Sequence, residues 1–305
     1  MTAKFEDAVL AGLSADPKAL SPKWLYDAAG SELFDEITRV PEYDLPAREA
    51  AAMADALPAI AAGLRGASVA EFGIGSGTKS IDLIEAVWPP LYVPLDISES
   101  ALDGAAARMR TRFAGLAIEP VAADFTRPVD LPPAFREAER RLGFFPGSTI
   151  GNFDDADAAA FLRACRSTLG RGARFLVGVD LVRDVDAMIA AYDDEGGVTA
   201  RFDLNLLTRI NREADGDFDP ARFRHEARWN ADHGRIEMHL VSALPQTVRV
   251  AGHAFAFAEG ESIHTESSHK FTLAGFEGLA GRGGWDTEQA WTDDAETFAV
   301  FLLAA

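Results

Sequence analysis

The chain has 305 residues and carries 48 Asp and Glu side chains against 29 Lys and Arg, a formal net charge of −19. Such a surface repels phosphate groups, which argues against nucleic acid or an anionic membrane as a partner. The single cysteine, Cys165, excludes internal disulfides and thiolate-rich metal sites, and we expect it in the core-facing side of a helix. There is no signal-peptide pattern and no run of about 18 apolar residues, so we expect a cytoplasmic protein.

From about residue 68, strand and helix patterns alternate along the chain. Apolar runs predict strands at 68–73, 91–97, 116–124 and 173–181, and another that ends near residue 145. Helical spacing predicts helices at 79–87, 98–113 and 155–169. This alternation predicts an α/β fold with a Rossmann-like, mostly parallel sheet that carries helices on both faces.

The regular alternation stops after Leu181 and returns near residue 271. The intervening stretch holds a predicted helix at 184–192, a turn-rich segment at 213–220 and strand-like pieces at 235–243 and 246–252. A helix at 272–285 and strands at 286–293 and 297–305 then follow. The sequence therefore predicts a sheet that an inserted unit interrupts, and we assign residues 1–46 to the same unit.

A glycine-rich loop, EFGIGSGTK at 71–79, joins the first of these strands to the first helix. Glycine allows positive φ and lets a ligand approach the backbone. The dinucleotide pattern G-x-G-x-x-G would need its third glycine at Thr78, which disfavours a dinucleotide-dependent oxidoreductase. A G-x-G-x-G loop preceded by an acid is instead typical of S-adenosylmethionine-dependent methyltransferases. We therefore predict Glu71, Gly73, Gly75 and Gly77 as cofactor-binding residues.

Two acidic residues close the next two strands. Asp96 ends the 91–97 strand, where such folds place the carboxylate that binds the ribose hydroxyls. Asp124 ends the 116–124 strand, where they hold the adenine amino group, with Phe125 as an apolar neighbour. An Asp at a strand end is often only a helix cap. Three motifs in order at the carboxyl ends of successive strands, where open α/β sheets bind ligands, nevertheless predict S-adenosylmethionine as the cofactor.

Further segments carry a resemblance to a known family. They are SPK, GSELFDEIT, PEY, GSTIGN, FDLNLLTRINRE, FDPARFRHEARWN, RIEMHL, QTVRVAG and TES…KF. Together with the glycine loop they resemble the histidine Nα-methyltransferases, the first enzymes of ergothioneine biosynthesis, over nearly the whole chain. The resemblance implies a class I methyltransferase domain at 47–182 and 271–305, split by an α+β substrate-binding domain at 1–46 and 183–270.

The resemblance also implies a set of site residues. The family's contacts to the α-amino and carboxylate groups of the amino acid fall on Tyr43, Asn152 and Tyr192, beside Gly147. Its imidazole contacts fall on Tyr26, Glu266 and Ser268, and its pocket lining on Phe34 and Met238. Its cofactor positions fall on Gly73, Lys79, Asp96, Asp124 and Phe125. Several of these residues have a structural alternative: Asn152 as a helix cap, Tyr192 as a helix aromatic and Met238 as a core residue.

The segment 261–271 reads as a strand, so its two-residue period places Glu266 and Ser268 on one face. His264 falls on that face and His269 on the opposite one, and the chain has no H-E-x-x-H pair, so we predict no metal site. Ser267 is a departure from the family and would widen the pocket. A second departure, Asp44-Leu45 after PEY, would alter the closing of the N-terminal segment over the substrate.

The predicted function is methyl transfer from S-adenosylmethionine to the α-nitrogen of L-histidine, up to the trimethylated product hercynine, with S-adenosylhomocysteine as by-product. The protein's task is to place a neutral nitrogen in line with the methyl group, and Tyr43 and Asn152 are the candidate catalytic residues for the proton that must leave. Two alternatives remain: an Nα-methyltransferase for another amino acid, such as tryptophan or a sulfur-substituted histidine, and a non-catalytic S-adenosylmethionine-binding module. We expect a monomer.

Tyrosine is scarce in this chain, with 4 residues against 20 phenylalanines. Each tyrosine hydroxyl is therefore a candidate for a polar role. Tyr26, Tyr43 and Tyr192 fall on implied substrate positions, and Tyr92 falls in an ordinary strand.

Overall fold

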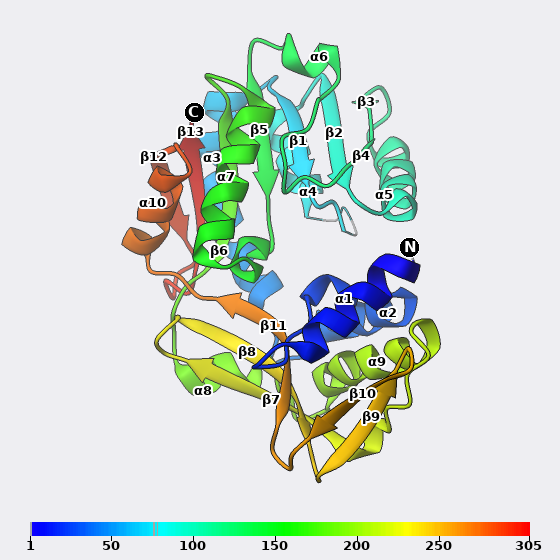
Figure 1. The fold of residues 1–305 in the computed structure, drawn as a ribbon. Coiled ribbons are helices and arrows are strands. Elements are labelled where there is room, and N and C mark those ends of the chain that lie inside the picture. The colour runs from blue at the N-terminus through cyan, green and yellow to red at the C-terminus, as the bar shows by residue number, and fades with distance from the viewer. Residues whose placement is uncertain (1, 76, 78) are drawn as a thin grey trace. The chain divides into compact units, whose positions relative to one another are not determined.

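The structure is a computed structural model that describes residues 2–75, 77 and 79–305 (Figure 1). Ser76 and Thr78 of the glycine loop lie outside the described residues. The chain divides into two compact units. The sheet unit comprises Ala47–Leu181 and Phe271–Ala305, and the insertion unit comprises Met1–Pro46 and Val182–Lys270.

The sheet unit contains the predicted α/β fold. Its strands are β1 (Ser68–Phe72), β2 (Leu91–Asp96), β3 (Ala117–Ile118), β4 (Val121–Ala122), β5 (Arg141–Phe145), β6 (Arg174–Asp180), β12 (Asp286–Thr292) and β13 (Phe298–Ala304). They are ordered β12-β13-β6-β5-β1-β2-β3, and β4 also pairs with β2. The pairs among β1 to β6 are parallel, whereas β13 runs antiparallel to β6 and β12. The prediction of a mostly parallel sheet is confirmed.

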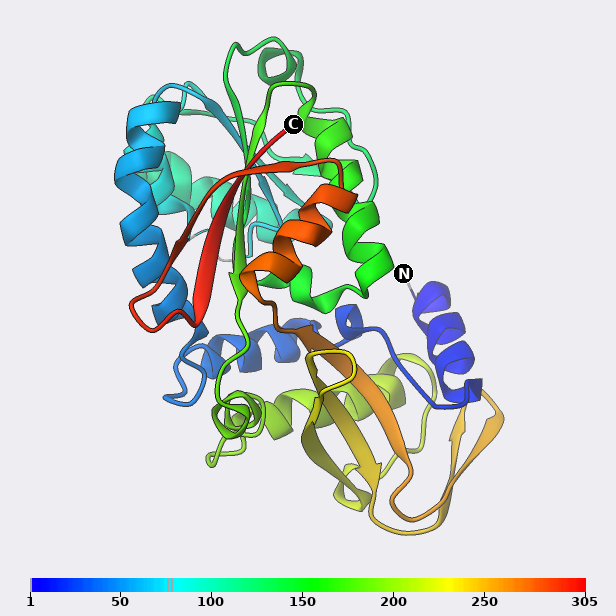
Figure 2. The same ribbon diagram turned by 90° about the vertical axis from the view of Figure 1, so that its left-hand side faces the viewer.

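Helices cover both faces of this sheet. They are α3 (Leu45–Leu64), α4 (Ser80–Val87), α5 (Glu99–Arg112), α6 (Pro133–Arg136), α7 (Asp155–Leu169) and α10 (Leu273–Arg282), with the short 3-10 helix η2 (Thr149–Asn152). Figure 2 shows α3 on one face and α7 with α10 on the other. Asp155 and Asp157 in the first turn of α7 favour the helix start, because acidic groups complement the positive end of the helix dipole.

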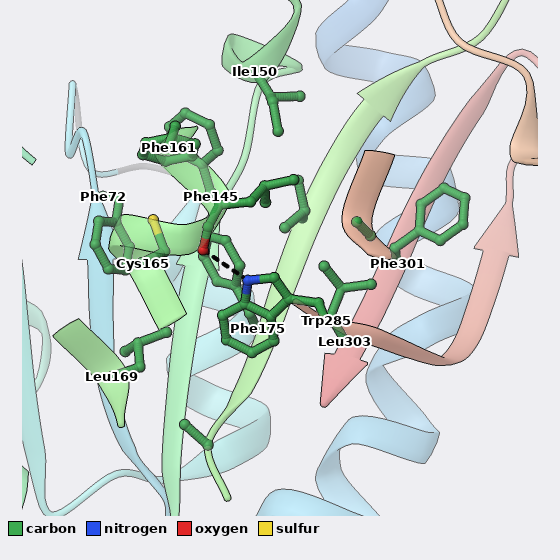
Figure 3. Close-up of a cluster of buried hydrophobic side chains, with 14 of the residues drawn as sticks. Phe72, Phe145, Ile150, Phe161, Cys165, Leu169, Phe175, Trp285, Phe301 and Leu303 are labelled. Carbon is green, nitrogen blue, oxygen red and sulfur yellow. Dashed lines mark hydrogen bonds between the residues drawn. The ribbon is translucent and has the colours of Figure 1, made fainter. Parts of the chain in front are cut away.

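The core of the sheet unit is rich in phenylalanine (Figure 3). Phe145 and Phe161 have ring centroids 4.6 Å apart, and Phe175 lies 5.3 Å from the Trp285 ring. The indole of Trp285 donates a hydrogen bond to the carbonyl of Leu162 at 2.9 Å, which satisfies the buried N–H. Cys165 is fully buried in α7, as the sequence predicts.

The predicted strand at 116–124 is broken into β3 and β4. Both pieces pair with β2 at the edge of the sheet, and Pro120 stands between them. Proline lacks a backbone N–H and interrupts the ladder of hydrogen bonds, which explains why one apolar run gives two short strands.

The insertion unit combines helices with antiparallel strands. Its helices are α1 (Thr2–Ser14), η1 (Pro22–Trp24), α2 (Ala28–Ile37), α8 (Val185–Ala190), α9 (Val198–Glu213) and η3 (Pro220–Arg222). Its strands are β7 (Phe223–Asn230), β8 (Arg235–Ser242), β9 (Gln246–Val250), β10 (His253–Phe257) and β11 (Ser262–His269). One sheet has the order β11-β8-β7, and β9 and β10 form a separate pair. The apolar face of α9 packs against β7 and β8, in a core that also takes Phe5 and Val9 of α1.

Within the described ranges 2–75, 77 and 79–305, no helix is both long and apolar enough to cross a membrane.

Candidate active site

The cofactor positions predicted from the sequence follow the carboxyl ends of β1, β2 and β4 in the sheet unit. Gly73 has φ 76° and donates its N–H to the carbonyl of Leu95 at 2.8 Å. A Cβ added to Gly73 would lie 3.4 Å from the ring of Phe125, so these two positions are direct neighbours. Gly75 has φ 49°, and its chain neighbours apart, no atom of the described residues lies within 4 Å of an added Cβ. The backbone beside Gly75 is therefore open, which fits a ligand that approaches the main chain. Gly77 has φ 70°, but an added Cβ would lie 3.3 Å from Ala105 Cβ, so this glycine is packed against α5.

Asp96 and Asp124 are each fixed by a local turn. Asp96 Oδ1 accepts the N–H of Ser98 at 2.9 Å. Asp124 Oδ1 accepts the N–H of Thr126 at 3.1 Å and its hydroxyl at 2.6 Å. These contacts orient both carboxylates at the strand ends, next to the glycine loop in the fold's usual ligand-binding region.

Glu71 supports the glycine loop from inside the protein. Its side chain is buried and accepts hydrogen bonds from the hydroxyls of Ser80, at the start of α4, and Tyr92 in β2. Burial raises the pKa of Glu71 to about 7, although both hydrogen bonds act in the opposite direction. Because residues 71 and 80 flank the loop, this carboxyl group connects its two ends. Tyr92, expected to be an ordinary strand residue, thus has a polar role.

A second carboxylate links the glycine loop to the loop after β5. Glu49 of α3 is buried, and its Oε2 lies 2.7 Å from Lys79 Nζ. Its Oε1 accepts the N–H of Gly147 at 2.5 Å. Asn152, further along the same loop, ends η2, and the N-cap of α7 is Asp154. The helix-cap alternative for Asn152 is therefore wrong.

The predicted aromatic residues form a continuous group in the insertion unit. The ring centroids are 5.4 Å apart for Tyr26 and Phe34, 6.4 Å for Phe34 and Tyr43, and 6.1 Å for Tyr43 and Tyr192. Phe202 of α9, which the sequence did not single out, lies 5.4 Å from Tyr26 and completes the group. Residues from distant parts of the chain thus gather in one unit, and their role as substrate contacts stays a prediction.

Tyr192 belongs both to this aromatic group and to a group of polar side chains. Its hydroxyl lies 2.7 Å from Ser268 Oγ, and Lys270 Nζ donates to the Tyr192 hydroxyl at 3.0 Å and to Ser268 at 2.9 Å. Lys270 is buried, and its ammonium stands 4.7 Å from the centre of the Tyr192 ring. Tyr192 is therefore more than a packed helix aromatic. Sequence reasoning did not list Lys270, although it lies inside the TES…KF segment.

Glu266 lies in β11 opposite Met238 of β8, and both side chains are buried. Met238 packs in the hydrophobic core of the insertion unit, which agrees with the alternative that it is a core residue. Among the described residues, Glu266 Oε2 has no hydrogen-bond partner. Burial raises the pKa of Glu266 to about 7 with help from the nearby Asp203, against Lys270 and His225. A buried acceptor without a donor is costly, so this oxygen fits a ligand that brings an N–H group.

Tyr26 belongs to the aromatic group that includes Phe34 and Phe202, although 39% of its surface stays exposed. Desolvation raises the pKa of Tyr26 well above 10, and the nearby Glu266, Tyr43 and Tyr192 reinforce the shift. The insertion unit therefore brings together all of its predicted substrate residues.

A β-bulge corrects the predicted faces of β11. His264 pairs with His239, whereas Glu266 pairs with Met238, so the extra residue Thr265 shifts the alternation by one. His264 therefore lies on the face opposite Glu266 and Ser268, and on the same face as His269, contrary to the simple two-residue period. Ser267 also lies on the His264 face and contacts the His264 ring at 3.1 Å. The expectation that Ser267 widens the pocket is wrong, because its side chain points away from Glu266.

Two further observations delimit the site. Across the described residues, no group of three or more His, Cys, Asp or Glu side chains is arranged to hold a metal ion. A surface hollow lined by Trp88, Arg112 and Phe113 lies where the chain enters β2 and β3, at the amino ends of these strands. It is thus at the opposite edge of the sheet from the glycine loop and does not belong to this site.

Comparison with known proteins identifies the family. Residues 5–305 match a family model described as histidine-specific methyltransferase, SAM-dependent. The chain belongs to this family. A histidine N-alpha-methyltransferase of Mycolicibacterium smegmatis is 39% identical over 300 residues, which cover 96% of this chain and 92% of that protein. Its counterpart in Mycobacterium tuberculosis is 38% identical and covers 97% and 93%.

The chain is also similar to part of a longer fungal protein. Ergothioneine biosynthesis protein 1 of Schizosaccharomyces pombe is 28% identical over 259 residues, which cover 81% of this chain and 34% of that protein. The predicted family, the S-adenosylmethionine cofactor and the methyltransferase class are confirmed. The roles of the individual site residues, and the assignment of one ligand to each unit, stay predictions.

Proposed function

We propose that this histidine-specific methyltransferase transfers methyl groups from S-adenosylmethionine to the α-nitrogen of L-histidine and forms hercynine, the first intermediate of ergothioneine biosynthesis. The observation that carries the proposal is the buried Glu266 carboxyl. One of its oxygens has no hydrogen-bond partner in the described part of the chain, and Tyr26 and the Tyr192–Ser268 pair belong to the same unit. An imidazole ring supplies the missing N–H donor. The names of the mycobacterial relatives support the same substrate.

Glu266 gives the site its selectivity. An ionised carboxyl group that accepts the ring N–H holds the imidazole in place. A side chain without a ring N–H would leave this buried charge unpaired, which penalises its binding strongly. Ser268, held by Tyr192 and Lys270, offers a second hydrogen-bonding group on the same face of β11.

The cofactor residues of the sheet unit fit S-adenosylmethionine. Its sulfonium group supplies an electrophilic methyl group. Gly73 and Gly75 leave the backbone of the loop accessible, and Asp96 and Asp124 offer hydrogen-bond acceptors at successive strand ends. Phe125 offers an apolar surface next to Gly73. These residues bind and orient, which is most of what the protein must contribute when the transferred group is already activated.

The substrate nitrogen must be neutral to act as a nucleophile. An α-ammonium group is protonated at neutral pH, so one proton must leave before each transfer. Tyr43 and Asn152 are the residues to which we assign contact with the α-amino group. The rings of Phe34 and Tyr43 suit the methylated ammonium group, because aromatic faces attract cations.

A direct assay tests this function. The protein is incubated with S-adenosylmethionine and a panel of free amino acids that includes histidine, tryptophan and a sulfur-substituted histidine. Mass spectrometry then follows the addition of one, two and three methyl groups. We expect trimethylated histidine. Methylation of another panel member alone would transfer the proposal to that substrate, and cofactor binding without any methylated product would favour a non-catalytic binding module.

A further inference from the structure

A buried ion pair interacts electrostatically with Glu266, and the function proposed above does not use this pair. Asp203 projects from α9 and His225 from β7, with His225 Nδ1 2.7 Å from Asp203 Oδ2. Their side chains are 0% and 1% exposed. Such a pair costs free energy to bury and adds little stability compared with apolar residues of similar size, so its presence suggests a functional reason.

His225 also holds the main chain of a predicted substrate residue. Its Nε2 lies 2.7 Å from the carbonyl oxygen of Tyr192. A carbonyl oxygen can only accept a hydrogen bond, so Nε2 carries a proton. The carboxylate of Asp203 is also an acceptor, so Nδ1 carries a second proton. Although burial opposes a charged ring, the hydrogen bond and charge of Asp203, together with Asp193, raise the pKa of His225. The geometry therefore indicates a positively charged His225.

Four ionisable side chains interact electrostatically with Glu266. Asp203 of α9 raises the pKa of Glu266, whereas Lys270, which follows β11, and His225 of β7 lower it. Glu266 in turn raises the pKa of Tyr26. Two carboxyl groups thus share a buried region with two cations. If one cation were missing, Asp203 would repel a negative charge on Glu266, because like charges in a poorly solvated site cannot both ionise at low cost.

We propose that His225 neutralises Asp203 and so keeps Glu266 available as an anion for the imidazole N–H of the substrate. In this role the Asp203–His225 pair is a positioning element: it acts on the substrate through Glu266 and through the main chain of Tyr192. The inference rests on the proposed function only for the identity of the ligand.

Charge-removing variants separate this role from simple packing. His225→Gln leaves Asp203 negative and uncompensated, so Glu266 keeps its proton to higher pH. Histidine binding at pH 7 should weaken on the order of tenfold and recover as the pH rises. In Asp203→Asn, His225 loses its proton as well, so the net charge of the pair stays zero and binding changes less. The double variant removes the unbalanced charge and should recover most of the binding lost in His225→Gln.

The measurements are calorimetric titrations of histidine and of S-adenosylmethionine between pH 6 and 9, with the melting temperature of each variant. His239→Gln is the matched control, because His239 lies on the face of the same sheet opposite His225 and is hydrogen-bonded to Ser262 and Glu237. It should leave histidine binding unchanged. Equal losses in His225→Gln and the double variant, at every pH, would show a packing role and overturn the inference.

A ligand-free measurement keeps this test independent of the substrate. Carboxyl-labelled glutamate and carbon NMR follow the titration of Glu266, with Glu266→Gln to assign its resonance. The midpoint should move to higher pH in His225→Gln and return in the double variant. An unchanged midpoint would refute the inference even if histidine is the substrate. Failure of the wild-type protein to bind histidine, with the midpoint shift intact, would refute only the proposed function.

Discussion

Glu71 makes the stability of the sheet unit depend on pH in an unusual direction. Its pKa rises from 4.5 to about 7 because the side chain is buried. At about 1.4 kcal/mol per pH unit, the folded state is destabilised by about 3 kcal/mol once the carboxyl group must ionise. Below pH 4.5 both states hold the proton and nothing is lost. Between pH 4.5 and 7 the unfolded chain releases it first, so stability falls as the pH rises, and above pH 7 the loss is complete.

The substitution Glu71→Gln tests this magnitude. The amide oxygen can still accept the hydroxyls of Ser80 and Tyr92, but it does not titrate. Urea unfolding of both proteins between pH 5 and 8 gives the free energy of unfolding at each pH. Other titrating groups, Glu266 included, are common to both proteins and cancel in the difference. The wild type should lose about 2.5 kcal/mol relative to the variant across this range, because the unfolded chain has already released most of its proton at pH 5. Parallel curves would refute the reasoning.

Three further substitutions address the ligand sites. Glu266→Ala should weaken histidine binding on the order of 100-fold or more and leave S-adenosylmethionine binding nearly unchanged, as measured by titration calorimetry. The control Ser267→Ala, on the opposite face of β11, should change the binding of neither ligand. Equal loss of both ligands in Glu266→Ala would mean that the imidazole site is misplaced. Gly73→Ala should lower cofactor affinity, because φ is 76° and Phe125 is in contact, while Gly63→Ala in the open end of α3 should raise the melting temperature slightly. Lys270→Met should raise the KM for histidine more than it lowers kcat, since it removes the donor shared by Tyr192 and Ser268; a change in kcat alone would contradict this role.

The sequence predicts the sheet unit well because each of its elements has a strong local signal. Strands alternate with helices, and the carboxyl ends of β1, β2 and β4 meet at one edge whatever the details of packing. The insertion unit has weaker local signals. The elements predicted from the sequence do not include helix α9, which begins at Val198. The carboxylate of Asp194 accepts the N–H groups of Val198 and Thr199. A cap that far upstream of the helix leaves no recognisable local pattern.

The site itself shows the same division between local and long-range information. The resemblance to the family singled out Tyr26, Tyr192 and Glu266 from the sequence, and the structure brings these side chains together. The bulge at Thr265 depends on the pairing of β11 with β8, so a two-residue period could not place His264. The Asp203–His225 pair could not be predicted either, because it joins a helix to a strand. A signal did exist, since Asp203 lies on the buried stripe of α9 with Phe202, Leu206, Leu207 and Ile210.

Buried acids explain more about this protein than its net charge of −19 does. Glu71 and Glu266 each have a pKa raised to about 7, one in each unit, and each lies beside tyrosine side chains. Selection for stability alone would remove such groups, because burying them costs free energy at neutral pH. Glu71 lies behind the glycine loop and Glu266 beside the aromatic cluster, which are the two places where we propose that ligands bind. The acids that reduce stability are therefore the ones most informative about function.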